Sequence, residues 1–198
     1  MITTADKILK RVRGMGRGSV FSAKQFVDLG SRAAVDQAMS RLAAKGDVRR
    51  LGRGVYDYPK LNSKLGVLTP SADIIADALA KKTKSRLQIS GAHAANALGL
   101  STQVPARAVY LTDGISRRVR LGNRTVELRH ASPRTMATAG RPSGTVIQAL
   151  RYIGRNAVDG KVIAKIKSSL SYEDRAALIR DVNYAPDWMR PALAHIAS

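Results

Sequence analysis

Residues 31–58 read SRAAVDQAMSRLAAKGDVRRLGRGVYDY and combine a helical pattern with two β-prone runs. Ser31 can cap a helix, and Gly46 can end it. The runs that follow, Val48–Leu51 and Val55–Tyr58, are joined by a glycine-arginine-glycine sequence that is typical of a tight turn. This segment therefore predicts a helix followed by a glycine-hinged β-hairpin.

Two more helices are predicted ahead of this segment. Apolar residues at helical spacing indicate a helix over Thr3–Arg13, with lysines and arginines on its other face. Ser22, with Gln25 three residues later, can cap a second, shorter helix that ends at Leu29. Helix, helix, turn, helix and β-hairpin is the order of a winged helix-turn-helix, which inserts the second helix of the motif into the DNA major groove. Small three-helix modules also mediate protein contacts, and this alternative stays open.

The predicted third helix turns its apolar residues to one side and leaves small and polar residues to face DNA. Gln37 can pair with an adenine edge, and Ala33 can touch a thymine methyl group. Arg53, at the hairpin tip, can enter a minor groove or contact a phosphate. Arg49 and Arg50 point to opposite faces of a strand, so we expect one of them to reach the DNA backbone. The residues predicted to bind DNA are Arg32, Ala33, Asp36, Gln37, Ser40, Arg41, Arg49, Arg50 and Arg53.

The composition favours a polyanionic partner. The 198 residues include 34 Lys and Arg against 14 Asp and Glu, a formal net charge of +20, and each phosphate neutralised by such side chains releases counterions. Residues 1–60 hold 13 basic and 5 acidic side chains, so the charge is not confined to either half. The absence of cysteine excludes disulfides and fits a reducing cytoplasm. No apolar run approaches the roughly 20 residues of a membrane span, so we expect a cytoplasmic protein with no membrane partner.

The remainder of the chain predicts a second domain. Thr69-Pro70 is expected to start a helix. Three β-prone runs follow, separated by Asp113-Gly114 and Gly122-Asn123, and such dipeptides are typical of hairpin turns. Helices are expected from about residue 145 to the end.

These patterns predict an α+β fold. It consists of an N-terminal winged helix-turn-helix followed by a mixed domain with a small antiparallel sheet and C-terminal helices. The expected organisation is a DNA-binding domain over residues 1–60, a linker over 61–68 and a mixed domain over 69–198.

The predicted sheet is rich in arginine. Residues 107–141 contain eight arginines and only two acidic residues, Asp113 and Glu127. A second DNA-backbone surface, a partner-docking surface and a solvated sheet face are all compatible with this composition. The candidate second basic surface comprises Arg117, Arg118, Arg120, Arg124 and Arg129, of which strand alternation puts Arg118, Arg120 and Arg129 on one face.

No catalytic residue, metal site or cofactor is predicted. His93, His130 and His195 are far apart in the chain, and a metal site would need them to converge. The serine-containing motifs lack the pattern of a nucleophile with its base, and the acidic residues do not form an evident metal-binding set. We therefore expect a binding protein and not an enzyme.

Four segments carry a family resemblance. They are ISGAHAANALGLSTQVPARAVYLTDG (Ile89–Gly114), RRVRLGNRTVELRHASPR (Arg117–Arg134), TPSADIIADALAKKT (Thr69–Thr83) and the Arg-Gly-Val-Tyr of the predicted hairpin (Arg53–Tyr56). In their order and spacing they resemble the AbiEi-like antitoxins of abortive-infection (type IV) toxin–antitoxin systems. The resemblance extends from Thr3 to about Arg155.

This resemblance implies an antitoxin that also represses transcription. The winged helix of such proteins is directed at inverted repeats in their own promoter, and the second domain counters a nucleotidyltransferase-like toxin. On this chain, Ser31–Lys45 and Arg49–Tyr58 would bind double-stranded promoter DNA, and residues from Thr69 onward would neutralise the toxin. Whether the two proteins touch stays open. The alternative is a stand-alone winged-helix transcriptional regulator whose second domain senses a ligand or drives oligomerisation.

Overall fold

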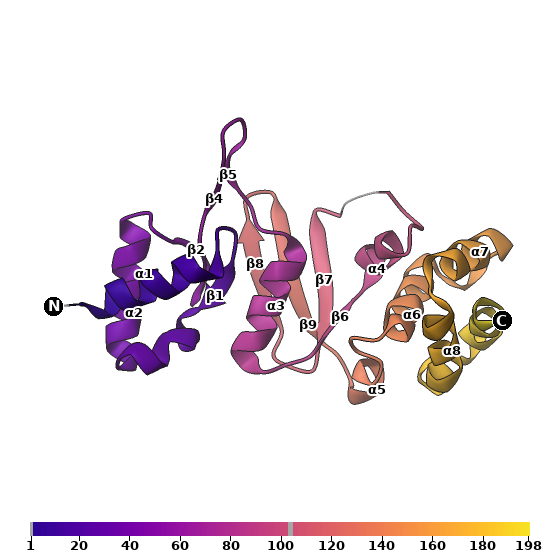
Figure 1. The fold of residues 1–198 in the computed structure, drawn as a ribbon. Coiled ribbons are helices and arrows are strands. Elements are labelled where there is room, and N and C mark those ends of the chain that lie inside the picture. Colours follow the sequence, from indigo (N-terminus) through magenta and orange to yellow (C-terminus); the bar gives the residue numbers. More distant parts are fainter. Residues whose placement is uncertain (1, 103–104) are drawn as a thin grey trace. The chain divides into compact units, whose positions relative to one another are not determined.

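The computed structural model of the protein describes residues 2–102 and 105–198. Gln103 and Val104, which belong to the segment Ile89–Gly114, lie outside the described residues. The fold is mixed α+β and divides into two compact units (Figure 1), Met1–Lys84 with Val119–Asn123, and Ser85–Arg118 with Arg124–Ser198. This division differs from the expected linker over residues 61–68, because the helix after that segment contacts the first unit.

Three helical segments open the first unit: α1 (Thr4–Met15), η1 (Ala23–Leu29) and α2 (Arg32–Ala44). The cap predicted for α2 is confirmed, since the Ser31 hydroxyl accepts a hydrogen bond from the Ala34 amide at 3.2 Å. The cap predicted at Ser22 is wrong. Ser22 is the last residue of a strand, its side chain makes no capping bond, and the segment after it is a 3₁₀ helix.

The apolar faces of these segments meet in one core. Ile8 of α1, Phe26 of η1 and Met39 of α2 are each completely buried. Phe21 and Phe26 pack edge to face with ring centroids 5.6 Å apart, a favourable aromatic geometry. The helical spacing in the sequence therefore identified the faces that pack together.

A three-stranded antiparallel sheet completes this part of the unit. Its strands are β1 (Val20–Ser22), β2 (Arg49–Gly52) and β3 (Val55–Asp57), in the order β1-β3-β2. The sequence predicted the β2–β3 hairpin but missed β1. The hairpin turns through Arg53 and Gly54, and Gly54 has a φ of 66°, a conformation that favours glycine. The register shifts between Arg50 and Gly52, and a bulge of this kind increases the local twist.

The expected linker is itself a hairpin, formed by β4 (Lys60–Asn62) and β5 (Gly66–Leu68). The Asn62 side chain closes it by accepting hydrogen bonds from the amides of Lys64 and Leu65, each at 2.9 Å. The next helix, α3 (Ala72–Thr83), is capped by Ser71. The predicted start at Thr69-Pro70 is therefore wrong, because the capping hydroxyl lies one residue beyond the proline.

A four-stranded sheet, most of which belongs to the second unit, has the strand order β6-β7-β9-β8. The strands are β6 (Leu87–Ile89), β7 (Arg107–Thr112), β8 (Arg117–Leu121) and β9 (Arg124–His130). The predicted Gly122-Asn123 turn does join neighbouring strands. The hairpin predicted at Asp113-Gly114 is wrong: β7 pairs antiparallel with β6 and parallel with β9.

Two long-range contacts favour this strand order over a β7–β8 hairpin. The Asp113 carboxylate, directly after β7, accepts hydrogen bonds from the Arg86 amide and from Arg86 Nε, each at 2.8 Å, and so links the end of β7 to the residue before β6. The parallel register places Tyr110 beside Leu128, and both side chains are buried. The apolar faces of β7 and β9 therefore meet directly.

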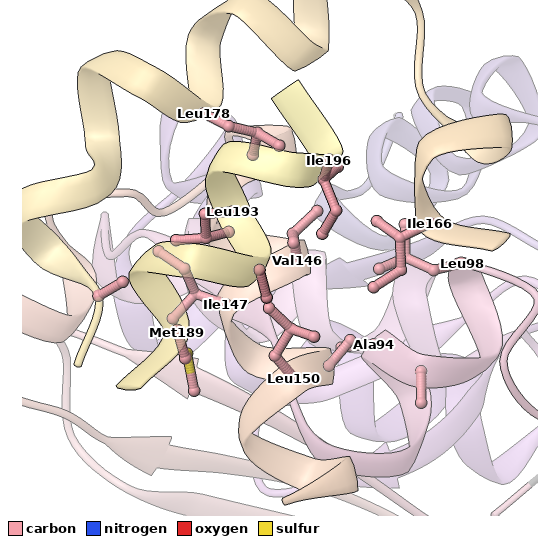
Figure 2. Packing of buried hydrophobic residues seen from close by; sticks show 14 residues of the cluster. Ala94, Leu98, Val146, Ile147, Leu150, Ile166, Leu178, Met189, Leu193 and Ile196 are labelled. Atoms are coloured by element: carbon pink, nitrogen blue, oxygen red, sulfur yellow. The ribbon is translucent and has the colours of Figure 1, made fainter. Parts of the chain in front are cut away.

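Helices form the rest of the second unit. One helix, α4 (Gly91–Ala97), lies between β6 and β7 in the chain. The helices that follow β9 are α5 (Pro133–Met136), α6 (Pro142–Ile153), η2 (Arg155–Ala157), α7 (Gly160–Ser169), α8 (Tyr172–Asp181), η3 (Val182–Tyr184), η4 (Asp187–Met189) and α9 (Arg190–Ala197). Their core gathers around Leu150 and Ile166, with Leu193 and Ile196 from the last helix (Figure 2). The C-terminal helices are confirmed. Within the described residues, no helix is both long and apolar enough to cross a membrane.

The start of α6 is packed too closely for any side chain at Gly144. A Cβ atom there would clash with the Thr138 carbonyl oxygen and with the side-chain amide of Gln88. Nearby, the buried Asp181 carboxylate accepts hydrogen bonds from Arg141 at 2.6 Å and from the Ser143 hydroxyl at 2.5 Å. This end of the helix is therefore fixed by polar contacts on both sides.

We predict that Gly144→Ala destabilises the protein by about 2–3 kcal/mol, because overpacking forces the backbone or the Gln88 side chain to move. Gly160→Ala is the matched control, since Gly160 lies in the first turn of α7 and has open space around its Cα. Urea unfolding followed by circular dichroism measures both. Equal unfolding midpoints for the two variants would contradict this account of the helix start.

Candidate nucleic-acid interface

The outer face of α2 is the first element of the candidate site. Val35, Met39 and Leu42 are buried, which turns the opposite side of the helix to solvent. Arg32 and Asp36 form an ion pair there, with Nε and Oδ2 2.9 Å apart. The exposed side chains of this face are Arg32, Ala33, Asp36, Gln37, Ser40 and Arg41. All six predicted α2 residues therefore lie on one accessible surface.

A hollow of about 400 Å³ brings the α2 face and the hairpin tip together. Arg53, at the tip, is exposed and lines the same hollow as Arg32 and Ser40. We call it the hairpin hollow. It is lined by Arg32, Asp36, Ser40, Ala43, Arg50, Arg53, Gly54, Tyr56 and Lys82. Four of these side chains are cationic and one is anionic, so the hollow favours an anion.

Lys82 belongs to the hairpin hollow although sequence analysis did not predict it. Its ammonium group donates a hydrogen bond to the Arg53 carbonyl oxygen at 2.7 Å. The contact spans 29 positions of the sequence, and Lys82 lies in the last turn of α3, outside the expected DNA-binding domain. Only the packing of α3 within the first unit brings this lysine to the hairpin.

A second hollow, of about 460 Å³, lies along the other side of α2. Its walls include Gln37 and Arg41 from α2 and the threonines at the start of α1. Arg41 and Lys45 supply positive charge. The Asp6 carboxylate bonds to the Thr3 amide at 2.9 Å and completes the cap of α1, so one carboxylate offsets part of that charge. The α2 face thus has a basic hollow on each flank.

Arg49 is placed differently from the other predicted DNA-binding residues. Its Nη2 lies 2.6 Å from Oδ2 of Asp57, whose side chain is completely buried, and 3.1 Å from the Leu68 carbonyl oxygen. Arg50 is exposed and lines the hairpin hollow. The two arginines point to opposite faces of the strand, as the alternation predicted. Arg50 lies beside the α2 face, whereas Arg49 bonds to Asp57 and Leu68 within the sheet region.

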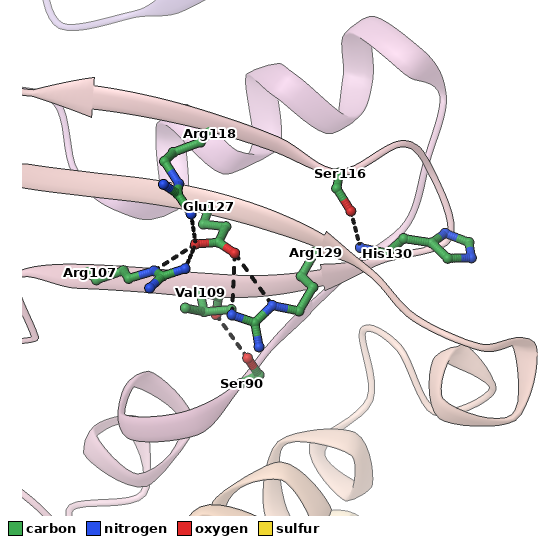
Figure 3. Close-up of polar contacts among 8 residues, drawn as sticks. All are labelled: Ser90, Arg107, Val109, Ser116, Arg118, Glu127, Arg129 and His130. Atoms are coloured by element: carbon green, nitrogen blue, oxygen red, sulfur yellow. Dashed lines mark hydrogen bonds and ion pairs between the residues drawn. The ribbon is translucent and has the colours of Figure 1, made fainter.

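In the second unit, three arginines converge on the Glu127 carboxylate (Figure 3). Arg107 donates to Oε2 from Nε at 2.6 Å and also from Nη2, and Arg118 lies 3.5 Å from the same oxygen. Arg129 approaches Oε1 at 3.3 Å. Arg118 and Arg129 were predicted to share a face of the sheet, and their common contact with Glu127 confirms it.

The other members of the predicted basic surface are less clustered. Arg120 and Arg124 are exposed, and Arg117 is half-buried. Neither Glu127 nor Arg107 was among the residues that the sequence pattern predicted for this surface. The parallel pairing of β7 with β9 places Val109 opposite Glu127, and Arg107 lies two residues away on the same face. That arrangement depends on the unexpected strand order.

Burial raises the pKa of the Glu127 carboxyl, but hydrogen bonds from Arg107 and Arg129 lower it by more. The net pKa lies below the ordinary value for glutamate, so the carboxylate is charged at neutral pH. The four side chains together carry a charge of +2.

Groups of three or more His, Cys, Asp or Glu residues able to hold a metal ion do not occur within residues 2–102 and 105–198. His93 instead packs edge to face on Tyr110, with ring centroids 5.2 Å apart. His130 contacts the Gly114 carbonyl oxygen through Nδ1 at 3.0 Å. The two histidines that lie near the sheet are therefore engaged in separate contacts.

Comparison with protein families identifies the class to which the chain belongs. Residues 7–178 match a family of unknown function, DUF6088. Because the match spans most of the 198 residues, the chain is a member of this family. No curated protein sequence matches it.

The fold is similar to that of a solved structure. The crystal structure of the RV2827C protein from Mycobacterium tuberculosis aligns with a TM-score of 0.50 and 14% sequence identity. The alignment covers 98% of this chain and 76% of the other. At this level of identity the similarity concerns the fold alone.

We predict that Arg49→Ala destabilises the protein by about 2–4 kcal/mol, because it leaves the buried Asp57 carboxylate without its charged partner. Arg50→Ala removes the same charge from the adjacent exposed position and should change the free energy of unfolding by less than about 0.5 kcal/mol. Chemical denaturation of both variants measures the difference. Equal stabilities would show that the Arg49–Asp57 pair does not support the sheet.

Proposed function

We propose that the first unit contains a winged helix-turn-helix domain that binds double-stranded DNA. The order α1-β1-η1-α2-β2-β3 supports this proposal, since it provides a helical core followed by a hairpin. In this interpretation α2 is the recognition helix and the β2–β3 hairpin is the wing. A recognition helix contacts base edges in the major groove, while flanking elements contact the sugar-phosphate backbone.

The observation that carries the proposal is the shared hollow between the α2 face and the hairpin tip. Ser40 and Arg53 come from different elements and line the same basic concavity. A helix inserted in the major groove has a phosphate backbone on each side, and each flank of α2 has a hollow with arginine or lysine in its wall. Cations in these positions would neutralise phosphates on both strands.

The residues of the α2 face suit the direct recognition of bases. Gln37 is exposed, and its amide group can donate to and accept from an adenine edge. Ala33 and Ser40 are small and exposed, which permits a close approach of the helix to the groove floor. The Arg32 guanidinium bonds to Asp36 through Nε, and its terminal nitrogens can donate to base edges or phosphates. These residues would supply sequence preference, whereas Arg50 and Arg53 would supply affinity for any duplex.

We further propose that the protein is the antitoxin of a toxin–antitoxin system and represses transcription from its own promoter. This proposal rests on the AbiEi-like segments Thr69–Thr83, Ile89–Gly114 and Arg117–Arg134. It assigns inverted repeats in promoter DNA and a nucleotidyltransferase-like toxin as partners, in the cytoplasm, and gives the chain no catalysis or cofactor of its own. Repression by the first unit and neutralisation by the second would then be separable by mutation.

For the DNA-binding proposal, we predict that Arg53→Ala weakens binding to all duplexes. Loss of one phosphate contact should lower affinity roughly fivefold to tenfold at 0.1 M salt and reduce the salt slope by about 0.9. Gln37→Ala should instead change the preference among sequences by about 1–3 kcal/mol at one position. Fluorescence anisotropy with the promoter duplex and a scrambled duplex, over a salt series, measures both effects. Wild-type behaviour of both variants would refute the proposed groove geometry.

For the antitoxin proposal, we predict that co-expression of the full chain with the nucleotidyltransferase-like product of an adjacent gene restores growth. The Gln37→Ala, Arg53→Ala double variant should rescue growth equally well while failing to repress a promoter reporter. A lack of rescue by the wild-type chain, with promoter binding intact, would instead identify a stand-alone transcriptional regulator.

A further inference from the structure

The arginine cluster of the second unit has a geometry that stability alone does not require. Arg107, Arg118 and Arg129 come from three adjacent strands, β7, β8 and β9, and all approach one carboxylate (Figure 3). One arginine suffices to pair with Glu127. The two additional guanidinium groups repel each other and the first, so their convergence costs Coulomb energy in the absence of a further anion.

The three arginine side chains of the cluster are also accessible to solvent. The side chains of Arg107, Arg118 and Arg129 are 50%, 58% and 55% exposed, whereas Glu127 is 12% exposed. Solvent screens the attraction between these half-exposed guanidinium groups and the carboxylate, and one arginine already gives the buried carboxylate a charged partner. Each guanidinium has five N–H donors, and one carboxylate cannot accept from most of them. The cluster therefore presents surplus donors and a charge of +2 to solvent.

The contacts to Glu127 indicate what kind of anion fits. Arg107 and Arg118 approach Oε2, while Arg129 approaches Oε1, so the guanidinium groups bracket a planar pair of oxygens. The two non-bridging oxygens of a phosphodiester form a comparable pair, and arginine binds phosphate and carboxylate with the same forked geometry. The guanidinium groups gathered around Glu127 thus present donors of the kind that a phosphate group accepts.

We propose that this face of the β7–β9–β8 sheet binds the phosphodiester backbone of nucleic acid. Arg107, Arg118 and Arg129 contact phosphate oxygens, and Glu127 orients the three guanidinium groups while competing with the phosphate. A nucleic-acid backbone fits better than an acidic protein, because three exposed arginines with a net charge of +2 suit a chain of closely spaced phosphates, and backbone binding is supplied by clustered arginine and lysine.

This site is separate from the promoter-binding proposal. Its residues all belong to the second unit, and α2 with its hairpin belongs to the first. Backbone contacts carry no sequence information, so the site should raise affinity for any duplex without altering sequence preference. Failure of Gln37→Ala to change preference would leave this inference intact, and failure of the present site would leave promoter recognition intact.

The test compares three charge changes in the full chain by anisotropy, using a fluorescent duplex without promoter sequence over a KCl series. Glu127→Gln removes the internal competitor and should tighten binding roughly fivefold to tenfold at 0.1 M salt, with a salt slope steeper by about 0.9. Arg118→Gln should weaken binding by a similar factor. Arg155→Gln is the matched control, since Arg155 is exposed in η2 and its loss changes the net charge equally; it should alter affinity less than about twofold.

Thermal unfolding of each variant separates binding from folding. Arg118 makes the longest contact with Glu127, at 3.5 Å, so the Arg118→Gln variant should fold normally. If Glu127→Gln is unstable, the comparison of Arg118→Gln with the Arg155→Gln control still decides the outcome. Equal weakening by Arg118→Gln and Arg155→Gln would overturn the proposal, because net charge alone would then explain binding. Unchanged duplex affinity in Glu127→Gln and Arg118→Gln would also overturn it. A third outcome would overturn it as well: if these variants change the affinity for fluorescent polyglutamate but not for the duplex, the partner is an acidic protein.

Discussion

The ion pair between Arg49 and the buried Asp57 carboxylate constrains the strand register of the first unit. Asp57 ends the central strand β3 and is paired in register with Val20 of β1 and Arg49 of β2. A fully buried carboxylate requires a charged or hydrogen-bonding partner, so a shift of register would leave it uncompensated. The same arginine also bonds to the Leu68 carbonyl oxygen. The pair thereby fixes both the hairpin that carries Arg53 and the end of the following hairpin.

The second unit depends on a different constraint, the insertion of β9 between β7 and β8. The sequence predicted a meander in which each strand pairs with the next. The parallel pairing observed instead buries Tyr110 beside Leu128 and brings Arg107 to the same carboxylate as Arg129. In a meander, Arg107 would lie on the far side of β8 from that carboxylate. The arginine cluster is therefore a product of topology, and strand alternation alone could only place its members on a common face.

Local physical rules account for the parts of the fold that sequence predicted well. The cap at Ser31, the Arg53–Gly54 turn and the apolar spacing of α2 each involve residues within one or two turns of chain, and the structure confirms all three. The prediction at Ser22 was wrong because the pairing of β1 with β3 is a long-range interaction that overrides a local capping pattern. Likewise, nothing local identifies Lys82 as a neighbour of Arg53.

The sequence by itself determined the positive charge, the helical faces and the exposed residues of α2, because these follow from composition and from the fixed period of a helix. It also separated Arg49 from Arg50 through the alternation of a strand. Only the tertiary structure decided that Arg49 supports the sheet, that Arg53 and Ser40 line one hollow, and that three arginines meet at Glu127. Each of those outcomes joins side chains that are distant in sequence, and their proximity depends on strand order and helix packing.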